Sequence, residues 1–275
     1  MSIINAAITA VGGYLPEDKI TNADLEKMVD TNNEWIMTRV GIRERRILKD
    51  PTKGASFLGI EAVKDLFSRN NIDPATIDGI IVTTNTADYH FPTTASIVAF
   101  ETGCVNAFTF DMQAACPGFI YALEAGANYI RSGRYKRIIV LAAEKMTAIT
   151  DYTDRATCPL FGDGAGCVLL EPTEEACGVM DASFHTDGIG RNNLILRAGG
   201  SVNPASHETV EARQHYIYQE GAAVFKHAVK GMSSSCRDIM QRNGLSYEDV
   251  AWVVPHQANL RIIDAVAREM KVPME

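Results

Sequence analysis

Two uninterrupted apolar segments constrain the fold of this chain more than any other feature of the sequence. Residues 80–82 read Ile-Ile-Val and residues 138–141 read Ile-Ile-Val-Leu. Strands that are apolar on both faces are typical of buried positions in parallel sheets. Apolar residues at helical spacing occupy residues 56–70, 92–103 and 119–130. Strand and helix therefore alternate, which predicts an α/β class with a mostly parallel sheet.

The alternation begins again after a polar, turn-rich segment at residues 172–178. The predicted elements that follow are a strand at 179–184, a helix within 214–243, a strand at 252–254 and a helix at 260–270. This second run is a weaker copy of the first and stops early. We therefore predict two related halves, residues 1–173 and 174–275, of which the second is incomplete. The glycine-rich residues 161–166 lack a following GK[ST] pattern and are predicted to form a tight turn.

Cys116 lies where a predicted strand, residues 107–112, passes into a helix, with Pro117 suited to the first helical position. The positive end of a helix favours a thiolate over a thiol, and the thiolate is the nucleophile. Free backbone N–H groups at such an end could also hold an oxyanion. The position thus suits a catalytic nucleophile, and the alternative interpretation is a small core cysteine.

His256 occupies the equivalent place in the second half, at the end of a predicted strand and just before a helix. Open α/β sheets bind ligands at this edge. If the halves are pseudo-symmetric, Cys116 and His256 face each other. A neutral imidazole there could donate a hydrogen bond or move a proton, whereas the alternative is a capping or core histidine.

Trp35 and Arg39 precede a basic segment at residues 43–46. These residues could bind a phosphorylated ligand, with the indole as a stacking face and the guanidinium as a phosphate donor. A solvated loop with local ion pairs is the other interpretation.

Composition excludes several classes of function. The net charge of −8 argues against nucleic acid as the main ligand. The six cysteines are scattered without CxxC spacing, which argues against a zinc site and a disulfide-rich fold. Neither a signal peptide nor an apolar stretch of membrane-spanning length is recognisable. We expect a reduced, cytoplasmic protein without a metal, a membrane anchor or a resident cofactor.

Several motifs occur in a fixed order along the chain: Thr21–Leu25, Glu34–Ile36, Arg39–Ile42, Ala114–Cys116, Thr153–Arg155, Phe161–Gly166 and Pro255–Arg261. With these motifs the sequence resembles the β-ketoacyl-acyl-carrier-protein synthase III family, the initiating condensing enzymes of bacterial fatty-acid synthesis. The resemblance implies a thiolase-like fold, in which two duplicated halves form alternating helix and sheet layers, and a homodimer.

The resemblance also implies the reaction. Cys116 would take an acyl group from acyl-CoA as a thioester, and malonyl-acyl-carrier-protein would then lose CO₂ and attack it in a decarboxylative Claisen condensation. His256 matches one of the donors that stabilise the enolate. The remaining matches are Trp35, Arg39, Arg155 and Asn259 for CoA, Gln257, Ala258, Asn259, Leu260 and Arg261 for docking of the carrier protein, and Phe91 for the partner subunit's acyl pocket.

One departure from the family concerns the end of the sequence. The family carries a second donor, an Asn in a Gly-Asn-Thr-Ser motif, whereas Asn259 is the only asparagine after His256. We therefore expect a C-terminally truncated member with little condensing activity, in which transfer of the acyl group to Cys116 could survive. The alternatives are another thiolase-fold CoA acyltransferase, such as a hydroxymethylglutaryl-CoA synthase, and an inactive fragment or non-catalytic partner.

Overall fold

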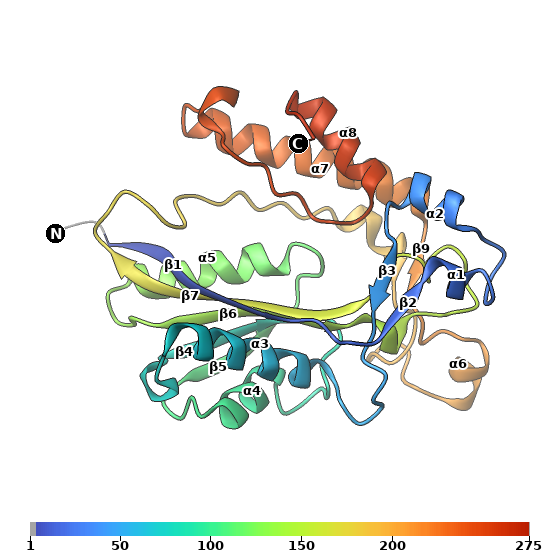
Figure 1. Cartoon of the computed structure of the whole chain (residues 1–275), viewed down its shortest axis with the longest axis horizontal. Helices are drawn as coiled ribbons and strands as arrows, with labels where there is room; N and C mark the ends of the chain where they lie inside the picture. The colour runs from blue at the N-terminus through green and yellow to red at the C-terminus, as the bar shows by residue number, and fades with distance from the viewer. Residues whose placement is uncertain (1–3, 275) are drawn as a thin grey trace. The chain divides into compact units, whose positions relative to one another are not determined.

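A computed structural model describes residues 4–274, which form two compact units (Figure 1). The first unit contains the chain up to residue 18 and residues 46–146 and 162–182. The second contains residues 19–45, residues 147–161 and the chain from residue 183. The units are therefore interleaved in sequence. The predicted duplication into halves at residues 173 and 174 is a different division and stays a prediction.

The first unit is built on one five-stranded sheet with the order β1-β7-β6-β4-β5. Its strands are β1 (Asn5–Tyr14), β4 (Gly79–Thr83), β5 (Phe108–Met112), β6 (Ile138–Lys145) and β7 (Asp163–Thr173). Strand β4 runs parallel to β5 and β6, whereas β7 runs antiparallel to β6 and β1. The prediction of a mostly parallel sheet is thus only half right. For β7 to run parallel to β6, a helical crossover would be needed between them, and the segment that joins them contains only a 3₁₀ turn.

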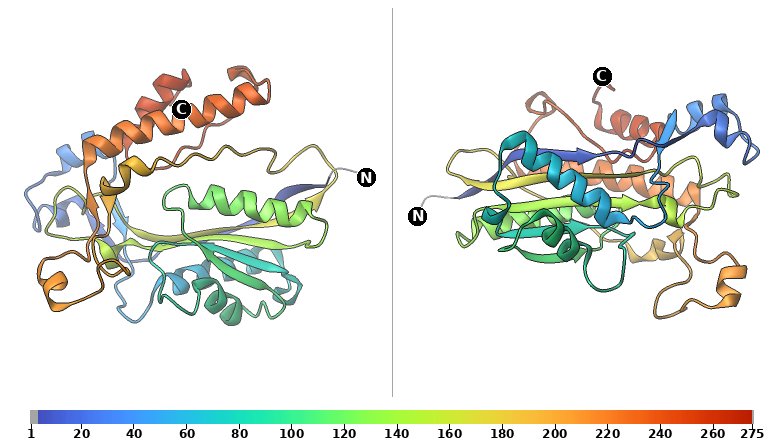
Figure 2. Two further views of the ribbon diagram at one scale, coloured as in Figure 1. Left: turned by 180° about the vertical axis from the view of Figure 1, so that it is seen from behind. Right: turned by 60° about the horizontal axis from the view of Figure 1, so that its bottom comes forward.

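Helices cover both faces of this sheet (Figures 1 and 2). They are α3 (Ala55–Asn70), α4 (Thr94–Thr102) and α5 (Gly118–Arg131), with a 3₁₀ turn η1 (Pro74–Thr76) before β4. Ile80 and Val82 pack with α3 and α4, whereas Ile81 packs with α5 on the opposite face. Because every side chain of β4 is buried, the strand is apolar without alternation, as the sequence predicts.

The glycine-rich residues do not form the predicted tight turn. Residues 163–166 belong to β7, where Gly166 pairs with Gly13 and Cys167 with Gly12. At Gly12 an added Cβ would lie 2.5 Å from the Ala62 carbonyl oxygen of α3. A glycine at position 12 therefore lets the backbone of α3 approach the sheet where β1 pairs with β7.

The second unit is assembled from short elements and two longer helices. In chain order they are β2 (Lys19–Thr21), α1 (Asn22–Leu25), α2 (Asn33–Arg39), β3 (Glu44–Arg46), η2 (Met146–Ile149), η3 (Gly188–Asn192), β8 (Leu194–Ile195), α6 (His207–Glu211), β9 (Tyr218–Gln219), α7 (Gly221–Arg242), η4 (Tyr247–Asp249) and α8 (Leu260–Met270). Helices α7 and α8 pack through Val229, Ile262, Val266 and Met270. The predicted helix at residues 260–270 is thereby confirmed.

A buried arginine joins two segments of the second unit that are far apart in sequence. The Arg45 side chain donates to the Pro159 carbonyl oxygen at 2.7 Å and to Asn22 Oδ1 at 2.5 Å. Burial lowers the pKa of Arg45. Beside it, Ile36 and Cys158 belong to a common apolar cluster. Residues 19–45 and 147–161 are thus held together by packing and by neutral acceptors around one guanidinium.

The two strands predicted for the second half are absent from residues 4–274. Residues 179–184 and 252–254 form no strand, although Val179 N donates to the Ala6 carbonyl oxygen of β1 at 2.9 Å, and Trp252 is 78% exposed. A short apolar triplet indicates a strand only when a neighbour satisfies its backbone groups, and periodicity carries no information about that neighbour.

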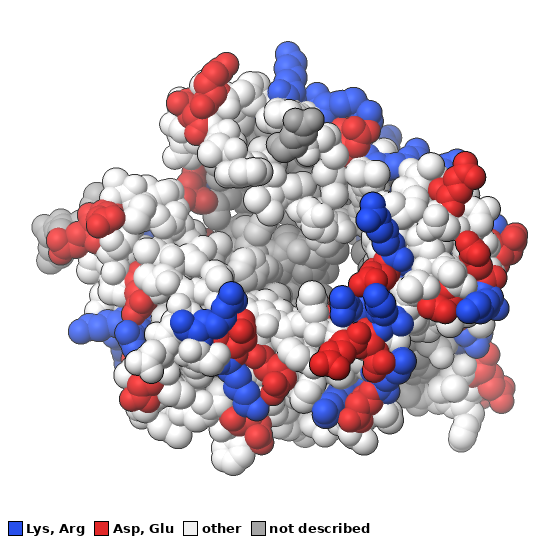
Figure 3. Space-filling model, in the orientation of Figure 1, with Lys and Arg blue, Asp and Glu red and all other residues white. Residues whose placement is uncertain are grey.

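None of the helices described is both long enough and apolar enough to cross a lipid bilayer. On the face drawn in Figure 3, basic side chains lie beside acidic ones over much of the surface.

Candidate functional site

The cysteine at the strand-to-helix turn of the first unit is presented to solvent. Strand β5 ends at Met112 and α5 begins at Gly118, with Pro117 as its N-cap. Ala115 has φ +50°, a left-handed conformation that is uncommon for a residue with a side chain. Its carbonyl oxygen accepts from the Gly118 N–H at 2.9 Å, which closes a sharp turn around Cys116. Cys116 is exposed, so the interpretation as a core cysteine is wrong.

The prediction that the start of the helix favours the thiolate of Cys116, and so lowers its pKa, is wrong. The pKa of Cys116 is raised, chiefly because neighbouring atoms dehydrate the part of the thiol that faces away from solvent, and also because of the Glu144 carboxylate. A backbone hydrogen bond at Cys116 opposes both effects without overcoming them. The thiol form therefore predominates at neutral pH in the environment of this unit, and a base is needed to remove its proton.

Glu144, on β6, accepts a set of hydrogen bonds that sequence reasoning did not identify. Its carboxylate accepts from Asn85 N at 2.8 Å, Asn85 Nδ2 at 3.0 Å and Thr86 Oγ1 at 2.5 Å, with a longer contact of 3.4 Å from Thr84 Oγ1. The Thr86 hydroxyl itself accepts from Lys145 N at 2.8 Å. Every neighbour in this set donates, so the geometry fits an ionised carboxylate, although burial raises the pKa of Glu144.

A hollow of about 470 Å³ opens within the second unit. Three of its lining residues are arginines, two are aromatic, and none is a carboxylate. Its main polar and aromatic lining residues are Trp35, Arg39, Arg155, Phe225, Asn259 and Arg261. A concave surface with cationic donors and aromatic faces suits a ligand that contains both phosphate and a flat ring.

Trp35 and Arg155 form the best-defined contact in this hollow. The Arg155 guanidinium lies 5.2 Å from the indole ring, and its Nη1 is 3.4 Å from Asp30 Oδ2. The N-cap of α2, Asn32, accepts from Trp35 N at 2.8 Å and so fixes the start of the helix that carries the indole. Arg39 is in the last turn of the same helix. The structure thus brings Arg155 into the same hollow as Trp35 and Arg39, which lie far from it in sequence.

Asn259, Arg261 and Ile262, at the start of α8, form another part of this hollow, whereas Gln257, Ala258 and Leu260 do not line it. Asn259 caps α8 by accepting from Ile262 N at 3.0 Å, and it lines the hollow. Leu260 N donates to the Val40 carbonyl oxygen at 2.9 Å, and Arg261 lies 5.6 Å from the Phe225 ring.

Gln257 and Ala258 precede the cap. Gln257 is exposed and its Nε2 donates to the Pro255 carbonyl oxygen at 3.3 Å, whereas Ala258 packs beside the α7–α8 cluster.

His256 and Phe91 are both exposed in their own units. Partial burial of the imidazole lowers the pKa of His256, which favours the neutral ring at pH 7. His256 belongs to the second unit and Cys116 to the first, and their predicted meeting stays a prediction. Phe91 is 86% exposed, and its role in a partner's acyl pocket also stays a prediction.

Sequence reasoning missed the start of α7 as part of this hollow. Gly221, Ala222 and Phe225 line it. The only signal in the sequence is the run of small residues at 221–223, which Phe225 follows after one valine.

A mixed sheet of this topology, with an exposed cysteine where β5 passes into α5, defines a thiolase-like acyltransferase. The family model of 3-oxoacyl-[acyl-carrier-protein] synthase III matches residues 110–188, and the model of the C-terminal part of the same synthase matches residues 240–275. The chain belongs to this family, whose members are the condensing enzymes that initiate type II fatty-acid synthesis, and it has their acyltransferase activity. The alternative of a hydroxymethylglutaryl-CoA synthase is thereby set aside.

Individual relatives agree with this assignment over the whole chain. The β-ketoacyl-[acyl-carrier-protein] synthase III of Porphyromonas gingivalis is 72% identical over 275 residues, and synthase III 1 of Bacteroides thetaiotaomicron is 55% identical. Both alignments cover all of this chain and 82% of the relative. The crystal structure of the Aquifex aeolicus synthase III superposes with a TM-score of 0.87 at 38% identity, over 98% of this chain and 82% of that one.

Proposed function

We propose that Cys116 accepts an acyl group from acyl-CoA while the nucleotide end of CoA occupies the hollow of the second unit. The observation that carries this proposal is the convergence of Arg39, Arg155 and Arg261 on a surface that also presents Trp35 and has no carboxylate among its lining residues. The guanidinium groups would bind the phosphates, and the indole would stack on the adenine ring. Acyl-CoA is a substrate here, and no resident cofactor is needed.

The acyl transfer begins with loss of the Cys116 proton. Because the pKa of this thiol is raised in the first unit, we assign the proton acceptor to the neutral imidazole of His256. The thiolate sulfur then bonds to the acyl carbon, and the CoA sulfur leaves as a thiolate that takes up a proton. Backbone N–H groups at the start of α5 would stabilise the oxyanion.

In the second half-reaction, malonyl-acyl-carrier-protein loses CO₂ and its enolate attacks the acyl carbon on Cys116. A neutral His256 would donate a hydrogen bond to the thioester oxygen while the negative charge develops. The product then leaves on the carrier protein, and the cysteine thiolate is released. Residues 257–261 would dock the acidic carrier, with Arg261 as the main contact because it is exposed and cationic.

We assign the assembly to a homodimer. Phe91 is 86% and Phe100 83% exposed on the first unit, and large apolar side chains of this kind are usual where a second copy binds. Phe91 would then reach the partner's acyl pocket. The CoA and carrier-protein substrates would place the protein in the cytoplasm, as the sequence predicts.

Intact-protein mass spectrometry after incubation with acetyl-CoA tests the first step. We expect one acetyl group, which peptide mapping locates on Cys116 and which Cys116→Ala abolishes. Cys177→Ala is the matched control, because Cys177 is also an exposed free thiol. An acetyl group on Cys177, or none on the unsubstituted protein, would refute the assignment of the nucleophile.

Two substitutions test the nucleotide site separately. Trp35→Ala and Arg155→Ala should weaken binding of adenosine 3′,5′-bisphosphate, the nucleotide end of CoA, in a calorimetric titration. The same variants should leave acetyl transfer from acetyl-pantetheine unchanged, since that donor lacks the nucleotide. Unchanged binding of the bisphosphate would place the CoA nucleotide elsewhere.

A further inference from the structure

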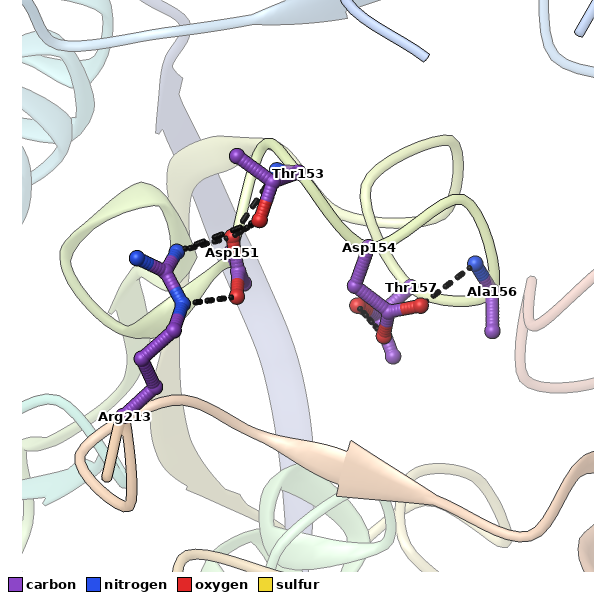
Figure 4. Close-up of polar contacts among 6 residues, drawn as sticks. All are labelled: Asp151, Thr153, Asp154, Ala156, Thr157 and Arg213. Carbon is purple, nitrogen blue, oxygen red and sulfur yellow. Dashed lines mark hydrogen bonds and ion pairs between the residues drawn. The ribbon is translucent and has the colours of Figure 1, made fainter. Parts of the chain in front are cut away.

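An ion pair outside the hollow holds the turn that precedes Arg155 (Figure 4). Arg213 donates through Nε to Asp151 Oδ2 at 2.9 Å and through Nη2 to Asp151 Oδ1 at 2.5 Å. The same Nη2 reaches Thr153 Oγ1 at 3.2 Å. Asp151 Oδ1 also accepts from Thr153 N at 2.8 Å and Thr153 Oγ1 at 2.7 Å. One bidentate arginine therefore fixes both an aspartate and the turn that begins at it.

A second aspartate-centred turn follows directly. Asp154 Oδ1 accepts from Ala156 N at 2.9 Å, and Oδ2 accepts from Thr157 Oγ1 at 2.7 Å. The Asp154 carbonyl oxygen accepts from Cys158 N at 3.0 Å. The first turn is joined to it, because Asp154 N donates to the Asp151 carbonyl oxygen at 3.0 Å. Arg155 thus lies within the second of two joined hydrogen-bonded turns, and Arg213 anchors the first.

We propose that Arg213 is a positioning residue for the nucleotide site, which holds the backbone of Arg155 so that its guanidinium lies over Trp35. This inference rests on the proposed function, since it takes the hollow as the site of the CoA nucleotide. Arg213 does not line the hollow. It can act on the ligand only through the turn at residues 151–154 and the following turn that carries Arg155.

The environment of Arg213 indicates more than a surface ion pair. The Asp151 side chain is only 13% exposed, and the Tyr216 ring lies 5.0 Å from the arginine guanidinium. Arg213 itself has φ +55°, a conformation that a non-glycine residue keeps only where its surroundings hold it. Ile217 N donates to the Ile149 carbonyl oxygen at 2.8 Å, so the backbone joins the same two segments a second time.

The test measures nucleotide binding apart from chemistry. In Arg213→Ala, calorimetric titration with adenosine 3′,5′-bisphosphate should give a Kd about tenfold weaker, because a misplaced binding group loses much of its interaction. The rate of Cys116 acetylation by acetyl-pantetheine should stay unchanged. Asp151→Asn should weaken binding to a similar degree, and the double variant should be no weaker than either single one, because both remove the same contact. Circular dichroism and the melting temperature verify folding.

Arg237→Ala is the matched control. Arg237 is 48% exposed, against 51% for Arg213, and pairs with Glu269 at 3.5 Å on the surface of the same unit. Its substitution should leave bisphosphate binding unchanged. Equal weakening by Arg237→Ala and Arg213→Ala would overturn the inference, because it would indicate a general charge effect.

The remaining outcomes separate this inference from the proposed function. If Arg155→Ala weakens binding and Arg213→Ala does not, the positioning role is wrong and the nucleotide site stands. If Arg155→Ala leaves binding unchanged, the nucleotide site is wrong and the inference fails with it. If Arg213→Ala slows acetyl transfer from acetyl-CoA and from acetyl-pantetheine equally, the arginine has a merely structural role and the inference is wrong.

Discussion

Replacement of Glu144 should reveal how the acidic group beside the nucleophile is held. In Glu144→Ala, the Asn85 N–H and the Thr86 hydroxyl lose an ionised acceptor at 2.8 and 2.5 Å. Hydrogen bonds to charged groups contribute about 1.5–3 kcal/mol each, and water entering the space should restore part of this. We expect the free energy of unfolding to fall by about 3 kcal/mol, which lowers the melting temperature by about 6–12 °C.

Glu144→Gln is the matched variant, because it removes the charge and keeps the shape. Its amide oxygen can accept from Asn85, and its NH₂ group can donate to the threonine hydroxyls. The Thr86 hydroxyl accepts from Lys145 N and the Thr84 hydroxyl from Thr86 N, so each has a lone pair left for a further donor. We expect a loss of about 1 kcal/mol or less.

Both variants should change the chemistry of the thiol in the same direction. Because the Glu144 carboxylate raises the pKa of Cys116, its removal should shift the pH dependence of Cys116 alkylation by iodoacetamide to lower pH. Cys177 serves as an internal reference for the reagent, since it is also exposed. Equal melting temperatures for the two variants would contradict the hydrogen-bond argument. An alkylation profile that does not move would contradict the electrostatic one.

Three further predictions concern the turn, the ion pair and the imidazole. In Gly118→Ala, the new Cβ would lie 2.0 Å from Thr83 Oγ1, so either the start of α5 or the buried Thr83 side chain must shift. We expect Cys116 acetylation to slow about tenfold, which time-resolved mass spectrometry measures. The pKa of Asp151 is lowered from 3.8 to about 2, so its ion pair stabilises the protein above pH 3.8 and this contribution is lost as the pH falls through about 2. Solvent around the half-exposed Arg213 weakens the pair, so Asp151→Asn should lower the free energy of unfolding at pH 7 by about 1 kcal/mol. Urea unfolding measures this difference, which should disappear in acid. Because the pKa of His256 is lowered from 6.5, its imidazole should still be neutral at pH 6.5, and malonyl-acyl-carrier-protein should be decarboxylated as fast there as at higher pH. A pH profile in which the rate falls to half its maximum above pH 6.5 would contradict a neutral imidazole.

The first unit could be predicted closely because its elements are long and regular. The buried strands β4 and β6 follow from uninterrupted apolar runs, and the helix after Cys116 follows from apolar residues at helical spacing. The direction of β7 could not be predicted, since it depends on whether the preceding segment crosses the sheet or returns along it. The function of Gly12 was equally hidden, because it depends on the approach of α3 at 2.5 Å from the position of an added Cβ.

The candidate site divides in the same way between local and distant contributions. The exposure of Cys116 follows from a strand, a turn and a helix that are consecutive in sequence. Its pKa does not, because a local rule predicts a lowered value whereas Glu144, 28 residues further along the chain, and dehydration of the thiol raise it.

The hollow of the second unit shows why sequence patterns alone could not have located it. Its residues come from 35–40, 155–160, 219–225 and 259–262, and two of these segments leave the first half of the chain to join the second unit. Neither segment has an apolar period that would predict a joint core. They are held by the buried Arg45, whose acceptor at Pro159 is 114 residues away, and by the Arg213–Asp151 pair, which spans 62 residues. The nucleophile and the proposed nucleotide site therefore belong to different compact units, although both depend on residues of the first half. Substitutions in the hollow should consequently alter binding of the nucleotide while the alkylation chemistry of Cys116 stays unchanged, and a substitution such as Trp35→Ala that alters both would show that this division of labour is wrong.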